Sequence, residues 1–336
     1  MSRNYRVTVL GDGGWGTALG LVSQRRHNPT LLWSAFPDYA KTLREKRENQ
    51  KFLPGIPLPP EIKVTSDLKE AVEFGEILII AIPTQFIRNV LHKLREVDLS
   101  KKIILSVAKG IEKKTHLRPS EIVESLLGRA NLAVLSGPSH AEEVARGIPT
   151  LVVVASKKEQ CAVQAQEALR DRTFRIYIQT DVIGTELGGS LKNVLAIAAG
   201  ICDGLGFGDN TKSGLLTRGL FEMTRLGVRM GANPNTFFGL SGLGDLMTTC
   251  FSPHGRNLRV GRELGKGKKI QEVLAGMEMV AEGVDTSEAV VELADKLGVK
   301  LAIMTEVYNV LFKGKDCSRA VEDLLARDAR EEWKQY

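Results

Sequence analysis

The chain has 336 residues, of which 43% are hydrophobic and 26% charged, so it can build substantial cores and still cover its surface with charge. A chain of this length favours two domains. Its longest apolar runs, such as residues 77–82 and 194–201, are too short to span a bilayer, so we expect no membrane insertion. The net charge of +6 is scattered without a long basic run, so we expect no nucleic-acid partner.

The four cysteines are widely spaced and form no CxxC pair, and the five histidines do not cluster with them. This pattern argues against a metal site. The N-terminal residues carry no apolar segment of the kind that a signal peptide needs. We therefore expect reduced thiols and a cytoplasmic protein.

The first half of the chain predicts strands that alternate with helices. Residues 6–10 predict a buried strand, a glycine-rich stretch follows, and residues 17–26 predict a helix. A strand at 30–33 and a helix at 37–49 precede a proline-rich loop at 52–61. The alternation then continues with strands at 62–66, 76–83, 102–108, 132–137, 150–156 and 174–179, and helices at 67–75, 84–97, 119–127, 138–147 and 158–170.

Alternating strands and helices of this kind indicate a Rossmann-like, doubly wound and mostly parallel sheet. Beyond about residue 180 the strand patterns disappear, and glycine-punctuated helical patterns take over. The sequence therefore predicts an α/β protein with two domains. Residues 1–180 form the dinucleotide-binding domain and residues 181–336 an all-helical domain.

The glycine-rich stretch reads Gly11-x-Gly13-x-x-Gly16 and lies directly between a predicted strand and a predicted helix. In a dinucleotide site the first glycine permits the tight turn and the second admits the pyrophosphate. The third glycine lets the helix pack against the strand. The helix N-terminus also offers free N–H groups to phosphate. A glycine turn that only connects the two elements is the alternative.

The end of the second strand does not decide between NAD and NADP. An acidic residue there usually binds the ribose of NAD, but Ser34 and Ala35 are neutral, and no arginine for a 2′-phosphate follows. Asp38 is a weak ribose candidate and a better helix N-cap. Both cofactors remain open.

Several stretches together resemble the NAD(P)-dependent glycerol-3-phosphate dehydrogenases of the bacterial type. They read GDGGWGTAL (11–19), SVAKGIE (106–112), LSGPSHAEEVARGIPT (135–150), ELGGSLKNVLAIAAGICDGLGFGDN (186–210), GLSGLGDLMTTC (239–250) and GRNLRVG (255–261). The resemblance implies reversible reduction of dihydroxyacetone phosphate to sn-glycerol 3-phosphate, a precursor of glycerophospholipids. It also implies NAD or NADP as cofactor and a homodimer.

Reduction of a ketone by hydride leaves an alkoxide, which needs a proton donor and a nearby positive charge. Lys192 lies at the start of an apolar helical stretch, where desolvation lowers the pKa of a lysine. The resemblance assigns Lys192 as the proton donor and acceptor. A lysine that snorkels at a helix edge is the alternative.

The resemblance also implies a set of substrate contacts, in which the Arg256–Asn257 pair holds the phosphate. These contacts are Lys109, Gly137, Ser139, Asn193, Asp245, Thr249, Gly255, Arg256 and Asn257. Three of them have ordinary structural alternatives. Lys109 suits a surface turn, Ser139 a capping box with Glu142, and Asp245 a helix N-cap.

The implied cofactor contacts are Gly11, Gly13, Gly14, Trp15, Gly16, Lys109, Ala141, Arg256, Val280 and Glu282. Three positions depart from the family pattern. Gly14 replaces a serine or asparagine, Gly255 replaces a serine, and Ala35 replaces a polar or basic residue. Two other functions stay open from the residues alone: a dehydrogenase of similar architecture that acts on another small acid, and a dinucleotide-sensing binding protein.

Overall fold

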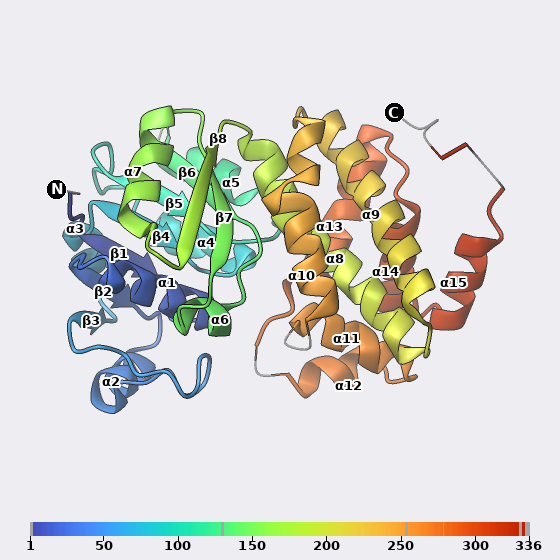
Figure 1. Ribbon diagram of the computed structural model, residues 1–336, viewed down its shortest axis with the longest axis horizontal. Helices are drawn as coiled ribbons and strands as arrows, with labels where there is room; N and C mark the ends of the chain where they lie inside the picture. Colours follow the sequence, from blue (N-terminus) through green and yellow to red (C-terminus); the bar gives the residue numbers. More distant parts are fainter. Residues whose placement is uncertain (1–2, 129–130, 253–254, 278, 329–330, 333–336) are drawn as a thin grey trace. The chain divides into compact units, whose positions relative to one another are not determined.

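The computed structural model describes residues 3–128, 131–252, 255–277, 279–328 and 331–332 (Figure 1). The chain divides into two compact units. The nucleotide-fold unit comprises Met1–Lys109 and Leu117–Glu186, and the helical unit comprises Gly110–His116 and Leu187–Tyr336. Each is described separately below. The sequence-based boundary near residue 180 stays a prediction.

The nucleotide-fold unit is built on an eight-stranded sheet of order β3-β2-β1-β4-β5-β6-β7-β8. All neighbouring strands are parallel except β6 and β7, which confirms the mostly parallel, doubly wound sheet. Four of the strands are buried along their whole length, as expected for a sheet covered on both faces. The strands are β1 (Val7–Leu10), β2 (Thr30–Trp33), β3 (Ile62–Thr65), β4 (Ile77–Ile80), β5 (Ile103–Ser106), β6 (Asn131–Ser136), β7 (Thr150–Ala155) and β8 (Phe174–Gln179).

Helices cover both faces of this sheet, and each face has its own hydrophobic core (Figure 1). One core contains side chains of α1 (Gly14–Arg25), α6 (Ala141–Ala145) and α7 (Glu159–Leu169). The other contains side chains of α3 (Leu68–Phe74), α4 (Thr84–His92) and α5 (Pro119–Leu127). The sheet therefore exposes its strand ends, and ligands of such sheets bind at the carboxyl ends.

Two helices end at least three residues earlier than the sequence pattern indicates. The helix α6 also begins later than expected, at Ala141 instead of residue 138. The helix α2 (Pro37–Lys46) stops because Arg47 adopts a left-handed conformation, with φ of 50°. The residues expected to finish it instead enter a loop in which Asn49 is buried. The helix α4 ends at His92 rather than residue 97, and the following residues form turns. Asp38 lies inside α2 and does not cap it, because Phe36 occupies the N-cap position.

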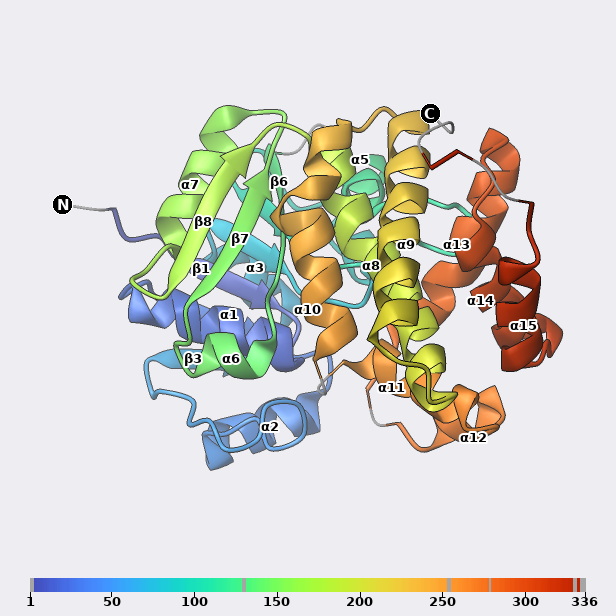
Figure 2. The same ribbon diagram turned by 45° about the vertical axis from the view of Figure 1, so that its right-hand side comes forward.

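The helical unit contains no strand among its described residues (Figure 2). Its central helix is α8, in which residues 187–202 are all buried. No described helix has the length and hydrophobicity that a membrane span requires. The elements are α8 (Val182–Gly204), α9 (Asp209–Arg229), the 3₁₀-helix η1 (Pro234–Phe238), the π-helix η2 (Leu240–Gly244), α10 (Asp245–Phe251), α11 (Arg256–Gly265), α12 (Ile270–Ala275), α13 (Glu282–Leu297), α14 (Ala302–Lys313) and α15 (Cys317–Leu325).

Helices α8 and α11 cross with backbone touching backbone. A Cβ atom placed on Gly200 would lie 2.2 Å from the carbonyl oxygen of Leu258, and one on Gly261 would lie 2.0 Å from that of Ile197. Gly204 and Gly265 repeat the contact one turn further along. Side chains normally keep helix axes 8–10 Å apart, so glycines are required for this approach. The crossing fixes α11, from Leu258 to its end, against the last two turns of α8.

Residues 110–116 leave the nucleotide-fold unit and join the helical unit as a short strap. The hydroxyl of Ser190 on α8 donates to the carbonyl of Gly110 at 3.2 Å. Further along, the Lys113 amine pairs with Asp285 on α13 at 2.5 Å, and His116 Nε2 lies 2.7 Å from Glu292 Oε2. Contacts at both ends and in the middle of the strap therefore attach it to α8 and α13.

Candidate active site

The glycine turn follows β1 and opens α1. Gly11 has φ of +123°, and a Cβ there would lie 2.5 Å from the Ala81 carbonyl oxygen, so only glycine fits. A Cβ on Gly16 would lie 2.1 Å from the Gly11 carbonyl oxygen, which explains the close packing of helix and strand. A Cβ on Gly13, in contrast, would meet nothing within 4 Å. The open side of this turn therefore lies at Gly13, the N-cap of α1.

Hydrogen bonds from Ser34 and Asn49 support the turn, and the sequence analysis assigned neither residue to the site. The hydroxyl of Ser34, at the end of β2, donates to the Asp12 carboxylate. Burial raises the pKa of Asp12, and the Ser34 hydrogen bond opposes that shift. The Asn49 amide donates to the Asp12 carbonyl and to the Thr17 hydroxyl, each at 2.7 Å. The Asp12 carboxylate therefore lies at the end of β2, although Asp12 belongs to the glycine turn and not to the strand.

The departure at Gly14 has a steric cause in this chain. A Cβ there would lie 2.5 Å from the carbonyl oxygen of Phe52, so a serine or asparagine would collide with the loop after α2. The same Cβ would lie 3.6 Å from the Cβ of Ala141, which places Ala141 beside the turn. The indole of Trp15 packs 6.4 Å from the ring of Phe174, in the core of the same unit.

Lys109 lies at the carboxyl end of the sheet, shortly after β5. Its amine donates to the Gly137 carbonyl at 3.0 Å and to the Ser139 hydroxyl at 3.1 Å. Gly137 has φ of +128°, so the chain turns sharply where β6 ends. The capping box expected at Ser139 is wrong, because His140 is the N-cap of α6 and the Ser139 hydroxyl donates to the Gly137 carbonyl. The structure thus brings Lys109, Gly137 and Ser139 together.

Lys192 is buried, with 7% of its surface exposed. Its amine lies 2.9 Å from the Asp245 carboxylate and 2.5 Å from the Thr249 hydroxyl. The lysine occupies the middle of α8, directly before the apolar stretch 194–201 of the same helix. Buried ammonium and carboxylate groups are stable only when paired in this way. The result is a buried polar cluster against an otherwise apolar helix.

Asp245 and Thr249 reach Lys192 because of the π-helix that precedes α10. A Cβ on Gly188 of α8 would lie 2.4 Å from the Ser241 carbonyl oxygen, so η2 lies directly on α8 one turn before Lys192. Asp245 is the first residue of α10, whose N-cap is Gly244, so the expectation of an Asp245 N-cap is wrong. Short π-helical segments are frequent at functional sites, and here one positions the carboxylate.

The Arg256–Asn257 pair begins α11. The Arg256 guanidinium is exposed, and one of its N–H groups donates to the Val280 carbonyl at 2.9 Å. The Asn257 side-chain oxygen accepts from the Gly283 N–H at 3.0 Å, at the start of α13. A Cβ on Gly283 would also lie 2.6 Å from the Asn193 carbonyl oxygen. The residue after Lys192 therefore touches the point where α11 and α13 begin.

The remaining predicted site residues lie at the same junction of helices. Glu282 is the first residue of α13, and Val280 precedes it with 41% of its surface exposed. Gly255 is the N-cap of α11, where a Cβ would lie 3.0 Å from the Thr249 carbonyl oxygen, so the usual serine has little room. Within the helical unit, the sequence-predicted residues thus form one cluster around α8, α10, α11 and α13. The described residues contain no group of His, Cys, Asp and Glu suited to a metal ion.

Comparison with known proteins matches both units to one family. Residues 6–162 match the model of the NAD-dependent glycerol-3-phosphate dehydrogenase N-terminus, and residues 181–322 match that of its C-terminus. Two proteins named glycerol-3-phosphate dehydrogenase [NAD(P)+] are similar over 97% of this chain. That of Geobacillus kaustophilus is 49% identical over 96% of its own length, and that of Chlorobium phaeobacteroides is 46% identical over 99%.

A solved structure gives the same result for the fold. The crystal structure of glycerol-3-phosphate dehydrogenase from Coxiella burnetii superimposes with a TM-score of 0.93 at 37% identity. The alignment covers 96% of this chain and 99% of that one.

Proposed function

Because the chain belongs to the NAD-dependent glycerol-3-phosphate dehydrogenase family, we propose that it transfers a hydride reversibly between NAD(P)H and dihydroxyacetone phosphate. The product is sn-glycerol 3-phosphate, a precursor for glycerophospholipid synthesis. The observation that carries the proposal is the buried Lys192 amine, held by Asp245 and Thr249. The next residue, Asn193, contacts the first turn of α13 through its backbone.

Lys192 is the proposed acid and base. A nicotinamide held in this site would supply hydride to the carbonyl carbon in reduction and would take it from the CH–OH carbon in oxidation. The ammonium of Lys192 donates a proton to the oxygen of that ketone, and the neutral amine recovers it in the reverse reaction. Asp245 and Thr249 orient the amine from two directions. The low exposure of all three side chains strengthens their electrostatic effect on the substrate oxygen.

The proposed substrate pocket uses the residues around this amine. Arg256 and Asn257 hold the phosphate, with the Gly255 backbone at the first turn of α11, where N–H groups favour an anion. A planar guanidinium matches phosphate oxygens in pairs. Asn193 lies next to Lys192 on α8. From the nucleotide-fold unit, Lys109, Gly137 and Ser139 complete the proposed set of substrate contacts.

The residues of the glycine turn fit a dinucleotide. The open side at Gly13 leaves room for a pyrophosphate against the backbone at the N-terminus of α1. Gly11, Gly14 and Gly16 shape the turn, and Trp15 and Ala141 flank it. Arg256, Val280, Glu282 and Lys109 are the further proposed cofactor contacts. Both NAD and NADP remain candidates.

An absorbance assay tests this function directly. Purified chain is mixed with dihydroxyacetone phosphate and either NADH or NADPH, and the loss of reduced nicotinamide is followed. We expect turnover, with kcat/KM for the two cofactors giving the preference. The absence of oxidation with both cofactors would contradict the proposal.

The assembly and location are also proposals. Phe238, Met247 and Phe251 in the helical unit each expose at least half of their surface, which supports a homodimer formed through this unit. All four cysteines are free and buried, which suits a cytoplasmic protein. Light scattering on the purified chain should give twice the mass of one chain, and the mass of a single chain would contradict the dimer. We propose small molecules as its ligands and no nucleic acid.

A further inference from the structure

Asp12 lies in the glycine turn, yet its side chain reaches the end of the neighbouring strand. The Gly11 N–H donates to the Trp33 carbonyl at 3.1 Å, so the turn stays paired with the end of β2 after β1 has ended. The hydroxyl of Ser34, the residue after β2, donates to Oδ2 of Asp12. A carboxylate is therefore fixed at the carboxyl end of β2, where dinucleotide folds usually bind the adenosine ribose of NAD.

One oxygen of this carboxylate is accessible and has no partner within the described part of the chain. Asp12 is 8% exposed, and its Oδ2 is occupied by the Ser34 hydroxyl. The other oxygen, Oδ1, accepts no hydrogen bond from another described residue, yet it is not a buried atom. A hydroxyl group that donates to a carboxylate oxygen makes a hydrogen bond strengthened by the negative charge. Asp12 Oδ1 is therefore a ready acceptor for a ligand hydroxyl.

Hydrogen bonds to the backbone of Asp12 hold this carboxylate in position. The Asn49 amide donates to the Asp12 carbonyl at 2.7 Å, and the Thr17 hydroxyl donates to the same carbonyl at 3.4 Å. Ser34 is itself completely buried, so the donor to Oδ2 is also fixed. A carboxylate held by packed neighbours does not turn away when a second negative charge approaches. Its position therefore discriminates between a neutral and an anionic group.

The segment that follows β2 offers little compensation for such a charge. NADP carries a 2′-phosphate where NAD carries a hydroxyl, and folds that bind NADP usually place an arginine beside that phosphate. Here both arginines between β2 and β3, Arg44 and Arg47, donate to carbonyls of β3 and of the loop before it. Burial raises the pKa of Asp12, and the Ser34 hydrogen bond and the charge of Lys51 oppose that shift. Lys51 therefore already acts on the Asp12 carboxylate.

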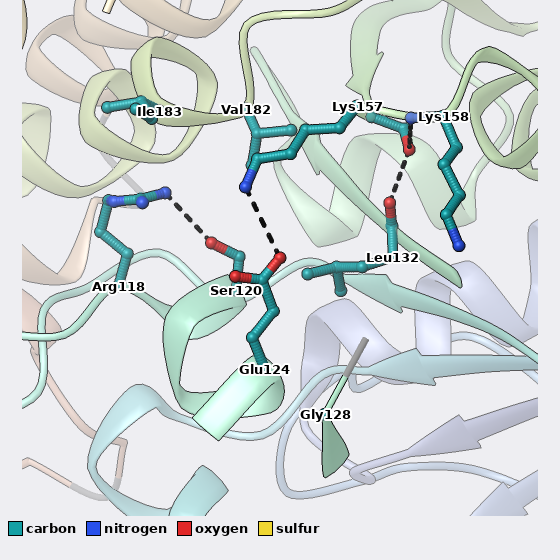
Figure 3. A pocket seen from close by; sticks show the side chains of 10 residues that line it. Arg118, Ser120, Glu124, Gly128, Leu132, Lys157, Lys158, Val182 and Ile183 are labelled. Atoms are coloured by element: carbon teal, nitrogen blue, oxygen red, sulfur yellow. Dashed lines mark hydrogen bonds and ion pairs between the residues drawn. The ribbon is translucent and has the colours of Figure 1, made fainter. Parts of the chain in front are cut away.

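A cavity of about 490 Å³ in the same unit lies away from this carboxylate. It is lined by residues at the start of β6, the end of β7 and the first turns of α5 and α8 (Figure 3). The start of β6 is at the amino edge of the parallel strands, whereas Asp12 is at their carboxyl edge. Arg118 and Lys157 of this cavity are already ion-paired with Glu186 and Glu124. We therefore expect a cofactor titration to report on the glycine turn and not on this cavity.

We propose that Asp12 makes this chain selective for NAD over NADP, because its carboxylate accepts a hydrogen bond from the 2′-hydroxyl of the adenosine ribose and repels a 2′-phosphate. The inference rests on the proposed function for the kind of cofactor, and it adds the residue that distinguishes the two cofactors. Asp12 determines specificity and takes no part in hydride or proton transfer.

Binding of NADH and NADPH to the full-length chain, followed by nicotinamide fluorescence without substrate, tests the selectivity. We expect the wild-type chain to bind NADH at least about tenfold more tightly than NADPH. Asp12→Asn keeps the shape of the side chain and an acceptor for the Ser34 hydroxyl, but it removes the charge. It should weaken NADH binding about threefold and tighten NADPH binding about tenfold. A general loss of structure would weaken the binding of both cofactors, so shifts in opposite directions identify the effect of the charge.

Asp38→Asn is the matched control, because Asp38 is the first acidic residue after β2 in the sequence and is exposed in the first turn of α2. It should leave both dissociation constants within about twofold of the wild-type values. A change in the ratio of the two constants in Asp38→Asn but not in Asp12→Asn would overturn the inference. A wild-type chain that binds NADPH as tightly as NADH would also overturn it.

A crystal structure of the wild-type chain with NADH gives a second readout that needs no variant. A ribose 2′-hydroxyl within hydrogen-bond distance of the Asp12 carboxylate supports the inference, and a 2′-hydroxyl bound elsewhere overturns it. The outcomes also separate this inference from the proposed function. Turnover of dihydroxyacetone phosphate with a cofactor ratio that Asp12→Asn does not alter overturns the role of Asp12 alone. A chain that binds neither cofactor overturns both.

Discussion

In the nucleotide-fold unit, the glycines of the dinucleotide motif lie within six residues, from the end of β1 into the first turn of α1. Gly11 and Gly13 lie in the turn and Gly16 in the first turn of α1, and the position of each glycine explains its role. In the helical unit, the important glycines lie on separate helices. Gly200 on α8 meets Gly261 on α11, and Gly188 on α8 meets the π-helix before Asp245. One unit builds its site locally, whereas the other assembles it from distant segments.

This difference teaches where a substitution will act. In the nucleotide-fold unit, a change in the turn alters ligand contact directly. In the helical unit, a change far from Lys192 in sequence can displace Asp245 or Arg256, because glycine contacts hold their helices against α8.

The largest expected effect is on kcat and follows from substitution of Lys192 in the helical unit. Lys192→Ala should lower kcat by about 10²–10⁴-fold, because it removes the proposed proton donor. The dissociation constant for NADH, measured by fluorescence, should change by less than about twofold, because the glycine turn lies in the other unit.

The control for this variant is Lys212→Ala, which also removes a buried lysine with an acidic partner, Asp203 at 2.8 Å. It should retain most of the wild-type rate. A Lys192→Ala chain with nearly normal kcat would refute the assigned role.

The next largest effect is expected where α8 and α11 cross. Gly261→Ala should destabilise the protein by about 1–3 kcal/mol, because its Cβ would lie 2.0 Å from the Ile197 carbonyl oxygen. It should also raise KM for dihydroxyacetone phosphate, since Arg256 and Asn257 begin the same helix. Urea unfolding and steady-state kinetics measure the two effects.

Gly214→Ala in α9 is the matched control, because its Cβ would meet nothing within 4 Å. It should stabilise the helix by about 0.5–1 kcal/mol and leave KM unchanged. If Gly261→Ala and Gly214→Ala had the same stability and the same KM, the close contact of α8 and α11 would not be what positions Arg256.

The helical unit also buries the carboxyl group of Glu222, whose protonation makes the stability of the fold depend on pH. Burial raises the pKa of Glu222 to about 7, although the N–H groups of Ile303 and Met304 oppose the shift. The folded state therefore holds this proton more tightly than the unfolded state. The resulting stability is complete below the unfolded pKa of 4.5 and is lost as the pH rises through about 7.

Glu222→Gln removes this titration. Between pH 5 and pH 7 the wild-type chain should lose about 2 kcal/mol of unfolding free energy relative to the variant. Urea unfolding of both proteins at the two pH values measures the change. A constant difference between the two proteins would show that Glu222 does not titrate in this window.

The smallest expected effect is a difference between substitutions at Gly13 and Gly11, two glycines of the same turn. Gly13→Ala should weaken NADH binding by roughly tenfold while leaving the unfolding midpoint unchanged, because its Cβ occupies only the open side of the turn. Gly11→Ala should instead lower the unfolding midpoint, since φ of +123° strains any residue with a Cβ. If Gly13→Ala lowered the unfolding midpoint and Gly11→Ala did not, Gly13 would not be the open position of the turn.

The local character of the nucleotide-fold unit explains why its architecture was predictable. Short apolar strands, glycine turns and amphipathic helices follow one another along the chain, and the sheet they indicate is present. The antiparallel direction of β7 has no such local signal. Nor does the contact of Asp12 with Ser34, because it depends on how β1 and β2 pair.

The helical unit was predictable as helices but not in its packing. The resemblance implies Lys192 and Asp245 as site residues, whereas the π-helix that brings them together has no periodic signature in the sequence. The capping box expected at Ser139 fits the spacing but fails in the structure, because the Ser139 hydroxyl donates to the Gly137 carbonyl and accepts from Lys109. Spacing alone does not show which of two partners a hydroxyl selects.

The strap of residues 110–116 has a practical consequence for dissecting the protein. Since these residues belong to the helical unit while both flanking segments belong to the other, no single cut in the chain separates the two units. A fragment that stops at residue 186 would retain Lys113 and His116 but lose Asp285 and Glu292, their partners on α13. Independent expression of the units therefore requires replacing the strap with a short linker, not merely truncating the gene.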